Sequence, residues 1–213
     1  MSTGRITLID YEAGNLASLE GALDRLGLAY VRAATPDQAT ASGPIVLPGV
    51  GHFEAARKSL RERGWWQLLP ELVAEGRPLL GICLGLQLLA EGSEEAPRTS
   101  GLGLIPGLVR RLGPGVKVPN MGWCQVRQGS AHPALPDPDG AWLYFVHSYA
   151  LEPSAETIYL ADHGRPFAAV EARGKVLGFQ PHPEKSGPAG LGLLQSALAW
   201  MGALPVSSEA PCN

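Results

Sequence analysis

The 213-residue sequence has little cysteine, little net charge and no long apolar run. Its three cysteines, at positions 83, 124 and 212, lack paired spacing and do not cluster with histidines, so neither a disulfide framework nor a zinc site is predicted. A formal net charge of −3 argues against nucleic acid or an anionic membrane surface as the partner. No segment resembles a membrane span or a secretory signal peptide. We therefore expect a cytoplasmic protein without metal or cofactor that acts on a small molecule or binds another protein.

The first half of the sequence alternates short apolar strands with amphipathic helices. Strands are predicted at 5–10, 29–33, 45–47 and 78–82, and helices at 16–26, 35–42, 53–63, 65–75 and 84–90. Such alternation is typical of an α/β fold with parallel strands, in which ligands bind at the carboxyl ends of the strands.

The second half contains shorter strand-like pieces separated by glycine, proline and polar residues. These pieces lie at 108–112, 123–127, 142–148, 157–161, 167–171 and 175–179, and they predict antiparallel hairpins. A last helix, at 191–201, is expected to pack on the sheet. We predict a single α/β domain over residues 1–202, with a central, mostly parallel mixed sheet flanked by helices, and a flexible tail over residues 203–213.

Cys83 is the first candidate for chemistry, because it falls where one predicted strand ends and a helix begins. Such a turn needs strained backbone, which the flanking Gly81 and Gly85 make accessible, and it aims the side chain out of the sheet edge. Amides at the start of the following helix favour the thiolate. On these residues alone, a buried structural cysteine fits about equally well.

A cysteine nucleophile needs a base, and the base needs a group that orients it. His182 lies between two prolines just after a predicted strand, and Glu184 follows two positions later, where extended backbone puts both side chains on one side. Without Cys83, this pair would be interpreted as part of an ordinary surface loop. Together the three residues predict a triad assembled in space.

Attack on an amide also requires backbone N–H groups that stabilise the oxyanion. The amide of Leu84 and one amide from residues 48–51 are the candidates. Gly49 and Gly51 permit peptide orientations closed to most residues, so rotation of one peptide could switch the site on or off. An ordinary turn is the alternative, whereas a phosphate-binding loop is disfavoured because no Lys-Ser/Thr pair follows the glycines.

Taken together, these motifs resemble those of the class I glutamine amidotransferases, in which a glycine-flanked cysteine and a later His-Pro-Glu form the triad. Within this class, the motifs and their order are similar to those of the glutaminase subunits of imidazole glycerol phosphate synthases, enzymes of histidine biosynthesis. The resemblance covers nearly all of the chain except its tail, and the similar segments lie at 9–16, 48–53, 81–89, 91–95, 121–123, 144–149, 178–180 and 182–186.

The resemblance implies a flavodoxin-like fold and a glutaminase activity. It implies that Cys83 attacks the side-chain amide of glutamine, that His182 protonates the departing ammonia, and that Glu184 orients His182. It also implies an oxyanion hole and a substrate-binding set, made respectively of Val50, Gly51 and Leu84, and of Gly49, Gln87, Glu95, Ser148 and Tyr149.

The resemblance also implies a partner. In this family ammonia passes to a (β/α)₈-barrel cyclase subunit, which makes imidazole glycerol phosphate and an aminoimidazole carboxamide ribonucleotide. The expected interface residues are Asn15, Pro119, Met121, Trp123 and Lys185. The chain departs from the family pattern at Asn120, Cys124 and Pro181.

Two alternatives remain open from the sequence. One is a glutaminase subunit of another synthase, such as that of anthranilate, aminodeoxychorismate or pyridoxal phosphate. The other is a non-catalytic interaction subunit that retains the triad.

Overall fold

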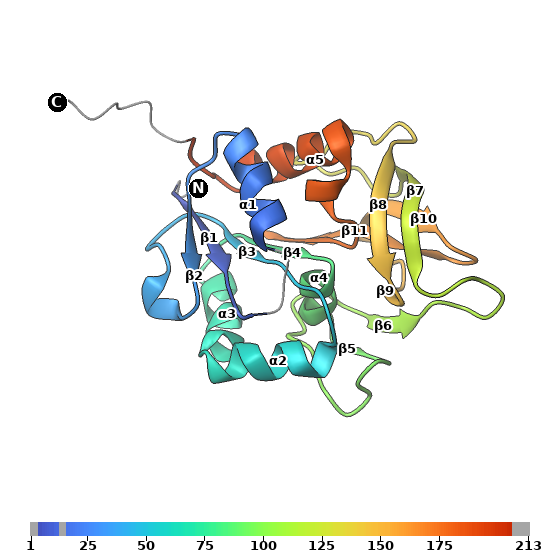
Figure 1. Cartoon of the computed structure of the whole chain (residues 1–213), viewed down its shortest axis with the longest axis horizontal. Helices are drawn as coiled ribbons and strands as arrows, with labels where there is room; N and C mark the ends of the chain where they lie inside the picture. Colours follow the sequence, from blue (N-terminus) through green and yellow to red (C-terminus); the bar gives the residue numbers. More distant parts are fainter. Residues whose placement is uncertain (1–3, 13–15, 206–213) are drawn as a thin grey trace.

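The computed structural model describes residues 4–12 and 16–205 (Figure 1). In chain order, the elements are β1 (Ile6–Ile9), α1 (Leu16–Arg25), β2 (Tyr30–Ala33), the 3₁₀ helix η1 (Pro36–Gln38), β3 (Ile45–Leu47), α2 (Phe53–Glu62), α3 (Trp65–Ala74), β4 (Leu79–Ile82), α4 (Leu84–Leu89), β5 (Gly92–Ser93), β6 (Leu108–Arg111), β7 (Asn120–Gln128), β8 (Trp142–His147), β9 (Tyr149–Leu151), β10 (Thr157–Asp162), β11 (Pro166–Arg173), β12 (Val176–Phe179), the 3₁₀ helix η2 (Pro183–Lys185) and α5 (Gly187–Trp200).

The main sheet joins nine of the described strands in the order β2-β1-β3-β4-β12-β11-β10-β7-β8. Along this order, neighbouring strands pair in parallel among β2, β1, β3, β4 and β12. Neighbouring strands pair antiparallel among β12, β11, β10, β7 and β8. A smaller sheet contains β5, β6 and β9. The predicted α/β fold with a mixed sheet and an antiparallel second half is therefore confirmed.

Helices cover both faces of the parallel strands, with α1 and α5 on one face and α2, α3 and α4 on the other (Figure 1). Leu19 of α1 and Leu198 of α5 belong to one apolar core, and Leu60 of α2 and Leu69 of α3 to the other. Coverage on both faces explains why β1, β3, β4 and β12 are buried at every residue, as is usual for parallel strands.

The helix predicted at 35–42 is shortened to the three residues of η1. The backbone N–H of Thr40 donates to Oγ1 of Thr7 (3.2 Å), and the backbone carbonyl of Thr40 accepts from Nη2 of Arg77 (2.7 Å). Because side chains from β1 and from the segment just before β4 satisfy these backbone groups, the segment gains nothing by continuing as a helix.

The described chain is bonded to the domain as far as residue 205, three residues beyond the boundary expected at 202. The N–H of Leu204 donates to the carbonyl of Gly4 (3.1 Å), and the N–H of Ala29 donates to the carbonyl of Leu204 (3.0 Å). Residues 206–213 lie outside the described residues. Within the described ranges, none of the helices combines the length and the apolar character that crossing a membrane requires.

Two helical glycines make the packing between α4 and β3 testable. A Cβ atom on Gly85 would lie 1.9 Å from the backbone oxygen of Leu47, whereas a Cβ on Gly21 in α1 would meet nothing within 4 Å. We expect Gly85→Ala to lower the free energy of unfolding by roughly 2–3 kcal/mol through overpacking. The matched Gly21→Ala should raise it by about 0.5–1 kcal/mol through helix propensity. Urea denaturation of both variants measures the difference, and equal effects would contradict this close approach.

Candidate active site

Cys83 stands at the carboxyl edge of the parallel strands, between β4 and α4. Its N–H donates to the carbonyl of Phe179 at the end of β12 (2.6 Å), and Phe179 pairs in register with Ile82. The Cys83 backbone has φ +55° and ψ −108°, a sparsely populated positive-φ conformation that costs about 1–3 kcal/mol for a residue with a side chain. The predicted strand-to-helix turn is therefore present, and its strain is located at the candidate nucleophile.

The glycines beside Cys83 serve a different purpose from the one predicted. Neither Gly81 nor Gly85 has positive φ, so they do not carry the strain of the turn. A Cβ on Gly81 would lie 2.7 Å from the carbonyl carbon of Gly85, and one on Gly85 would strike Leu47. These glycines allow α4 to pack directly on the strands, while the strain falls on Cys83 itself.

His182 and Glu184 form a buried pair at the end of the neighbouring strand. Nδ1 of His182 and Oε1 of Glu184 are 2.8 Å apart, with only 3% and 5% of the two side chains exposed. The backbone N–H of His182 donates to the carbonyl of Tyr144 in β8 (2.9 Å), which fixes the residue against the antiparallel part of the sheet. Because Nδ1 is bonded to Glu184, Nε2 is the ring nitrogen left to interact with Cys83.

The charges around His182 favour an imidazolium. Burial opposes the charged form, but interactions with the Cys83 sulfur and with Glu184 outweigh it and raise the pKa of His182 to about 10. Nε2 is buried and meets no hydrogen-bond acceptor or donor of standard geometry within the described part of the chain. The ring is therefore charged, oriented by Glu184 and free at the nitrogen that proton transfer requires.

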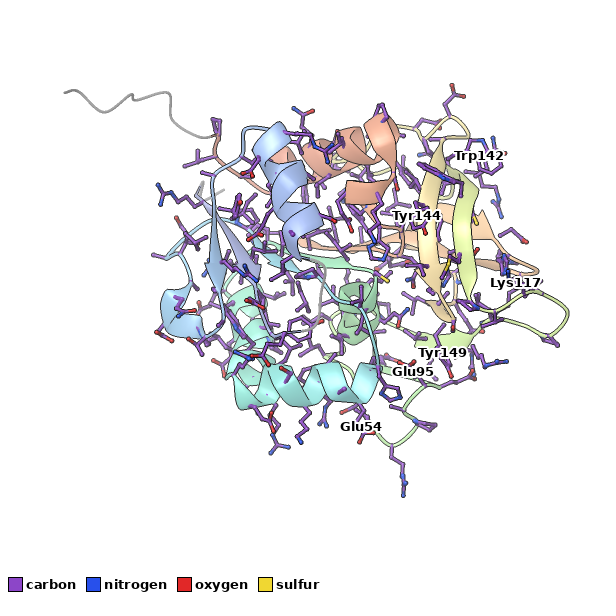
Figure 2. All side chains as sticks on the ribbon, viewed as in Figure 1. Glu54, Glu95, Lys117, Trp142, Tyr144 and Tyr149 are labelled. Atoms are coloured by element: carbon purple, nitrogen blue, oxygen red, sulfur yellow. The ribbon has the colours of Figure 1, made fainter. Side chains whose placement is uncertain are left out.

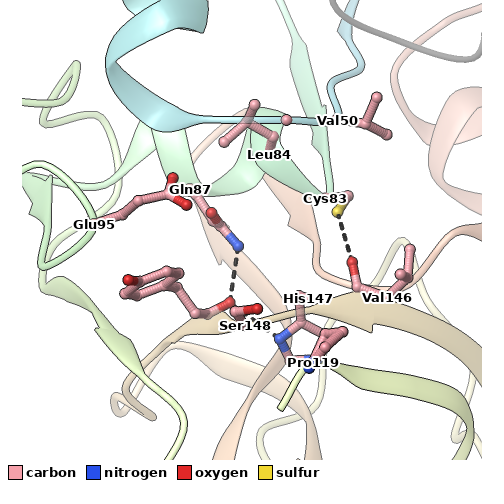
Figure 3. A pocket seen from close by; sticks show the side chains of 11 residues that line it. Val50, Cys83, Leu84, Gln87, Glu95, Pro119, Val146, His147 and Ser148 are labelled. Carbon is pink, nitrogen blue, oxygen red and sulfur yellow. Dashed lines mark hydrogen bonds between the residues drawn. The ribbon is translucent and has the colours of Figure 1, made fainter.

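A cavity of about 250 Å³ opens beside Cys83 (Figure 3). The cavity is lined by eight of the sequence-predicted site residues, namely Val50, Gly51, Cys83, Leu84, Gln87, Glu95, Ser148 and Tyr149. Pro119, from the expected interface, also lines it. Gly49, His182 and Glu184 do not line it. Val146 and His147 do, although the sequence did not single them out as site residues. The volume suits a ligand the size of an amino acid, below the roughly 300–1,000 Å³ of drug-sized sites.

Two polar side chains of the cavity wall are held in place by the surrounding backbone. Nε2 of Gln87 donates to the carbonyl of Tyr149 (2.9 Å) and to Oε1 of Gln180 (3.2 Å). Oε2 of Glu95 accepts from the N–H of Phe53 at the start of α2 (2.7 Å). The cavity thus presents an oriented amide and an oriented carboxylate, groups able to bind an amino acid's polar ends.

The expected oxyanion amide is occupied in this structure. The N–H of Leu84 donates to the carbonyl of Gly49 (3.3 Å), and Gly49 is buried against Leu84. The Gly49 carbonyl therefore accepts the hydrogen bond that the Leu84 N–H would have to donate to a negatively charged substrate oxygen. An open oxyanion hole requires this peptide to turn.

His147 is a cavity residue with a structural set of hydrogen bonds. Its ring nitrogens lie 3.1 Å from Nδ2 of Asn120 and 3.0 Å from the carbonyl of Tyr149. Burial lowers the pKa of His147 to about 4, so the ring is neutral at pH 7. Asn120, one of the departures from the family pattern, is therefore buried against His147 and Cys124 and does not face solvent as expected of an interface residue.

The expected partner face includes exposed apolar side chains. Met121 and Trp123 are 64% and 51% exposed, and they lie in strand β7, which begins three residues before the strand predicted at 123–127. Trp123 packs edge-to-face on Tyr144, with ring centroids 5.9 Å apart, and Figure 2 shows Tyr144 and Trp142 on the adjoining strand β8. Lys185 is exposed, whereas Asn15 lies outside the described residues. We call Met121 and Trp123 the β7 patch.

The described residues contain no group of three or more His, Cys, Asp or Glu side chains arranged to hold a metal ion. The groups present at this site are a cysteine, an imidazolium and backbone amides.

Comparisons with known proteins agree with this chemistry. Residues 7–198 match the family model "Glutamine amidotransferase class-I". The chain is 47% identical over 193 residues to the imidazole glycerol phosphate synthase subunit HisH of Streptococcus gordonii, covering 88% of this chain and 92% of that protein. It is 44% identical over 196 residues to the subunit of the same name from Moorella thermoacetica, covering 90% and 92%.

Among solved structures, a glutamine amidotransferase superposes with a TM-score of 0.72 at 22% identity and covers 91% of this chain and 99% of that one, which shows the shared fold. From the family match and the two relatives, the chain belongs to the class I glutamine amidotransferases and, within them, to the family of the imidazole glycerol phosphate synthase subunit HisH.

Proposed function

We propose that this glutaminase hydrolyses glutamine with Cys83, His182 and Glu184, and delivers the ammonia to a (β/α)₈-barrel cyclase subunit. The observation that carries the proposal is the pairing of β4 with β12, because it brings Cys83 and the His182–Glu184 pair to one sheet edge beside a cavity. The family supports the reaction, and the chemistry of these side chains supports their roles.

The chemistry proceeds in two steps. The Cys83 thiolate attacks the side-chain amide carbon of glutamine, and imidazolium His182 gives its Nε2 proton to the departing nitrogen, which leaves as ammonia. Water then attacks the thioester, with neutral His182 accepting its proton, and releases glutamate and the thiolate. Throughout the cycle, Glu184 holds Nδ1 and stabilises the charged ring.

Catalysis requires an oxyanion hole, which rotation of the Gly49–Val50 peptide would create. Rotation withdraws the Gly49 carbonyl from Leu84 and turns the Val50 N–H toward the cavity, giving two donors. One such donor is typically worth about 10²–10³ in rate. We infer that the arrangement with Leu84 bonded to Gly49 is a resting state, and that the partner subunit favours the rotated one.

The β7 patch is the proposed docking surface for the cyclase. Pro119 lines the cavity and lies two residues before Met121, so the reaction site and the patch are adjacent. Exposed Met and Trp side chains suit a protein interface, where large apolar and aromatic residues are enriched. Ammonia formed at Cys83 would therefore emerge beside the partner and not into bulk water.

Partner dependence tests the proposal directly. We expect slow glutamine hydrolysis by the chain alone and at least about 100-fold faster hydrolysis with the cyclase and its nucleotide ligand, because two oxyanion donors become available and one alone is worth about 10²–10³ in rate. Glutamate production, followed with and without the partner, measures this ratio. Full activity in isolation would refute the resting state, and stimulation by an anthranilate or aminodeoxychorismate synthase instead would redirect the partner assignment.

The nucleophile has its own test. Cys83→Ala should lower glutamine hydrolysis at least roughly 10³-fold while the chain stays folded, since it removes the attacking atom. A glutamine-like diazoketone should label the wild-type chain stoichiometrically and leave Cys83→Ala unlabelled. Cys124→Ala is the matched control and should keep both labelling and hydrolysis. If labelling disappeared in Cys124→Ala, the reactive thiol would be Cys124 and the assignment of Cys83 as nucleophile would be wrong.

The charge state of His182 predicts a pH dependence. Its pKa of about 10 exceeds the ordinary 6.5, so this group stabilises the fold fully below pH 6.5, and the stabilisation is lost as pH rises toward 10. Cys83→Ala and Glu184→Gln should each lower the pKa of His182, because each removes a favourable charge. NMR titration of the ring checks this, with Cys124→Ala as the unchanged control. An identical titration in Cys83→Ala would show that the ring does not sense the sulfur.

A further inference from the structure

Tyr11 carries a buried hydroxyl with no hydrogen-bond partner among the described residues. Only 1% of the residue is exposed. Buried hydroxyls nearly always have a partner, because an unpaired one loses its bonds to water and gains nothing in return. The unpaired hydroxyl of Tyr11 therefore needs a physical explanation.

The hydroxyl adjoins the loop that the oxyanion hole depends on. A Cβ atom built on Gly49 would lie 2.2 Å from the Tyr11 hydroxyl oxygen, so this oxygen is in contact with the Gly49 main chain. The backbone carbonyl of Tyr11 accepts a hydrogen bond from Oγ of Ser59 in α2 (2.6 Å), which fixes the position of the Tyr11 backbone. Tyr11 is thus held beside the Gly49–Val50 peptide.

The Tyr11 hydroxyl keeps its proton at pH 7 and is therefore able to donate a hydrogen bond. Burial, and to a smaller extent the charge of Cys83, raise the pKa of Tyr11 above its ordinary value. A neutral hydroxyl has one proton to donate. What it lacks in this structure is an acceptor.

Rotation of the Gly49–Val50 peptide creates an acceptor that lacks a donor. In the resting arrangement, the Gly49 carbonyl accepts from the N–H of Leu84. Once the peptide turns, that bond breaks, and the carbonyl must find another donor in a buried environment. Tyr11 supplies an unpaired hydroxyl in contact with this same glycine.

We propose that Tyr11 is a positioning residue whose hydroxyl donates to the Gly49 carbonyl in the rotated, active state. The inference rests on the proposed glutaminase function. In the resting state the Tyr11 hydroxyl has no partner among the described residues. In the active state it is bonded to Gly49, and the N–H of Leu84 becomes available to the substrate oxyanion. The new hydrogen bond exists in only one of the two states, so it shifts the equilibrium between them.

The test compares Tyr11→Phe with Tyr159→Phe, which also removes one buried hydroxyl. The hydroxyl of Tyr159 donates to the carbonyl of Pro136 and lies outside the Cys83 cavity. Steady-state glutaminase kinetics with the cyclase and its nucleotide ligand, and thermal unfolding of the isolated chain, are measured for both variants and the wild type.

Tyr11→Phe should lower the stimulated kcat about tenfold and change KM for glutamine less than about twofold, because it weakens the active state and not substrate binding. It should not lower the unfolding midpoint, since its hydroxyl is unpaired in the resting chain. Tyr159→Phe should do the reverse, lowering the midpoint by about 2–4 °C and leaving the stimulated kcat unchanged.

Each other outcome counts against a specific claim. A stimulated kcat retained in Tyr11→Phe overturns the role of Tyr11 while leaving the proposed function intact. A kcat loss accompanied by a midpoint lowered as in Tyr159→Phe shows a purely structural role and also overturns it. A wild-type chain that hydrolyses no glutamine with its partner contradicts the proposed function itself.

Discussion

The parallel pairing of β4 with β12 is the contact on which the site depends. These strands are remote in sequence, yet their register places Ile82 opposite Phe179, and the N–H of Cys83 closes the pairing on Phe179. Parallel strands end at the same sheet edge, so the residues that follow them meet there. A register shift of one residue would turn every side chain to the opposite face and separate the sulfur from the imidazole.

Burial strengthens the electrostatic interactions among the residues that this strand pairing brings together. His182 and Glu184 are almost fully excluded from water, so their hydrogen bond and the nearby sulfur act with little screening. The neighbouring His147 is also buried, but its hydrogen-bond partners are the neutral side chain of Asn120 and the carbonyl of Tyr149, so burial lowers its pKa whereas the pKa of His182 is raised. Two buried histidines thus take opposite charge states because of their partners and not because of their depth.

Local patterns in the sequence predicted most of the fold. The strand-helix alternation and the turn at Cys83 follow from short-range periodicity, and they are found where expected. The helix expected at 35–42 was wrong, because Thr7 and Arg77 compete for its backbone groups from other elements. The strand predicted at 123–127 begins earlier, at Asn120, because pairing with β8 extends it over Met121. Pairing and competition of this kind involve distant residues, which no local pattern records.

The sequence by itself determined which groups are available: a cysteine at a strand end, a His-Pro-Glu motif after another strand, and a loop with two glycines. These are properties of neighbouring residues and of backbone freedom, so they can be identified without coordinates. Only the tertiary structure decided that Leu84 is bonded to Gly49, that the Tyr11 hydroxyl beside that glycine meets no partner in the described part of the chain, and that Asn120 is buried against His147. Each depends on packing between segments distant along the chain, where shape and hydrogen-bond satisfaction select one arrangement from many.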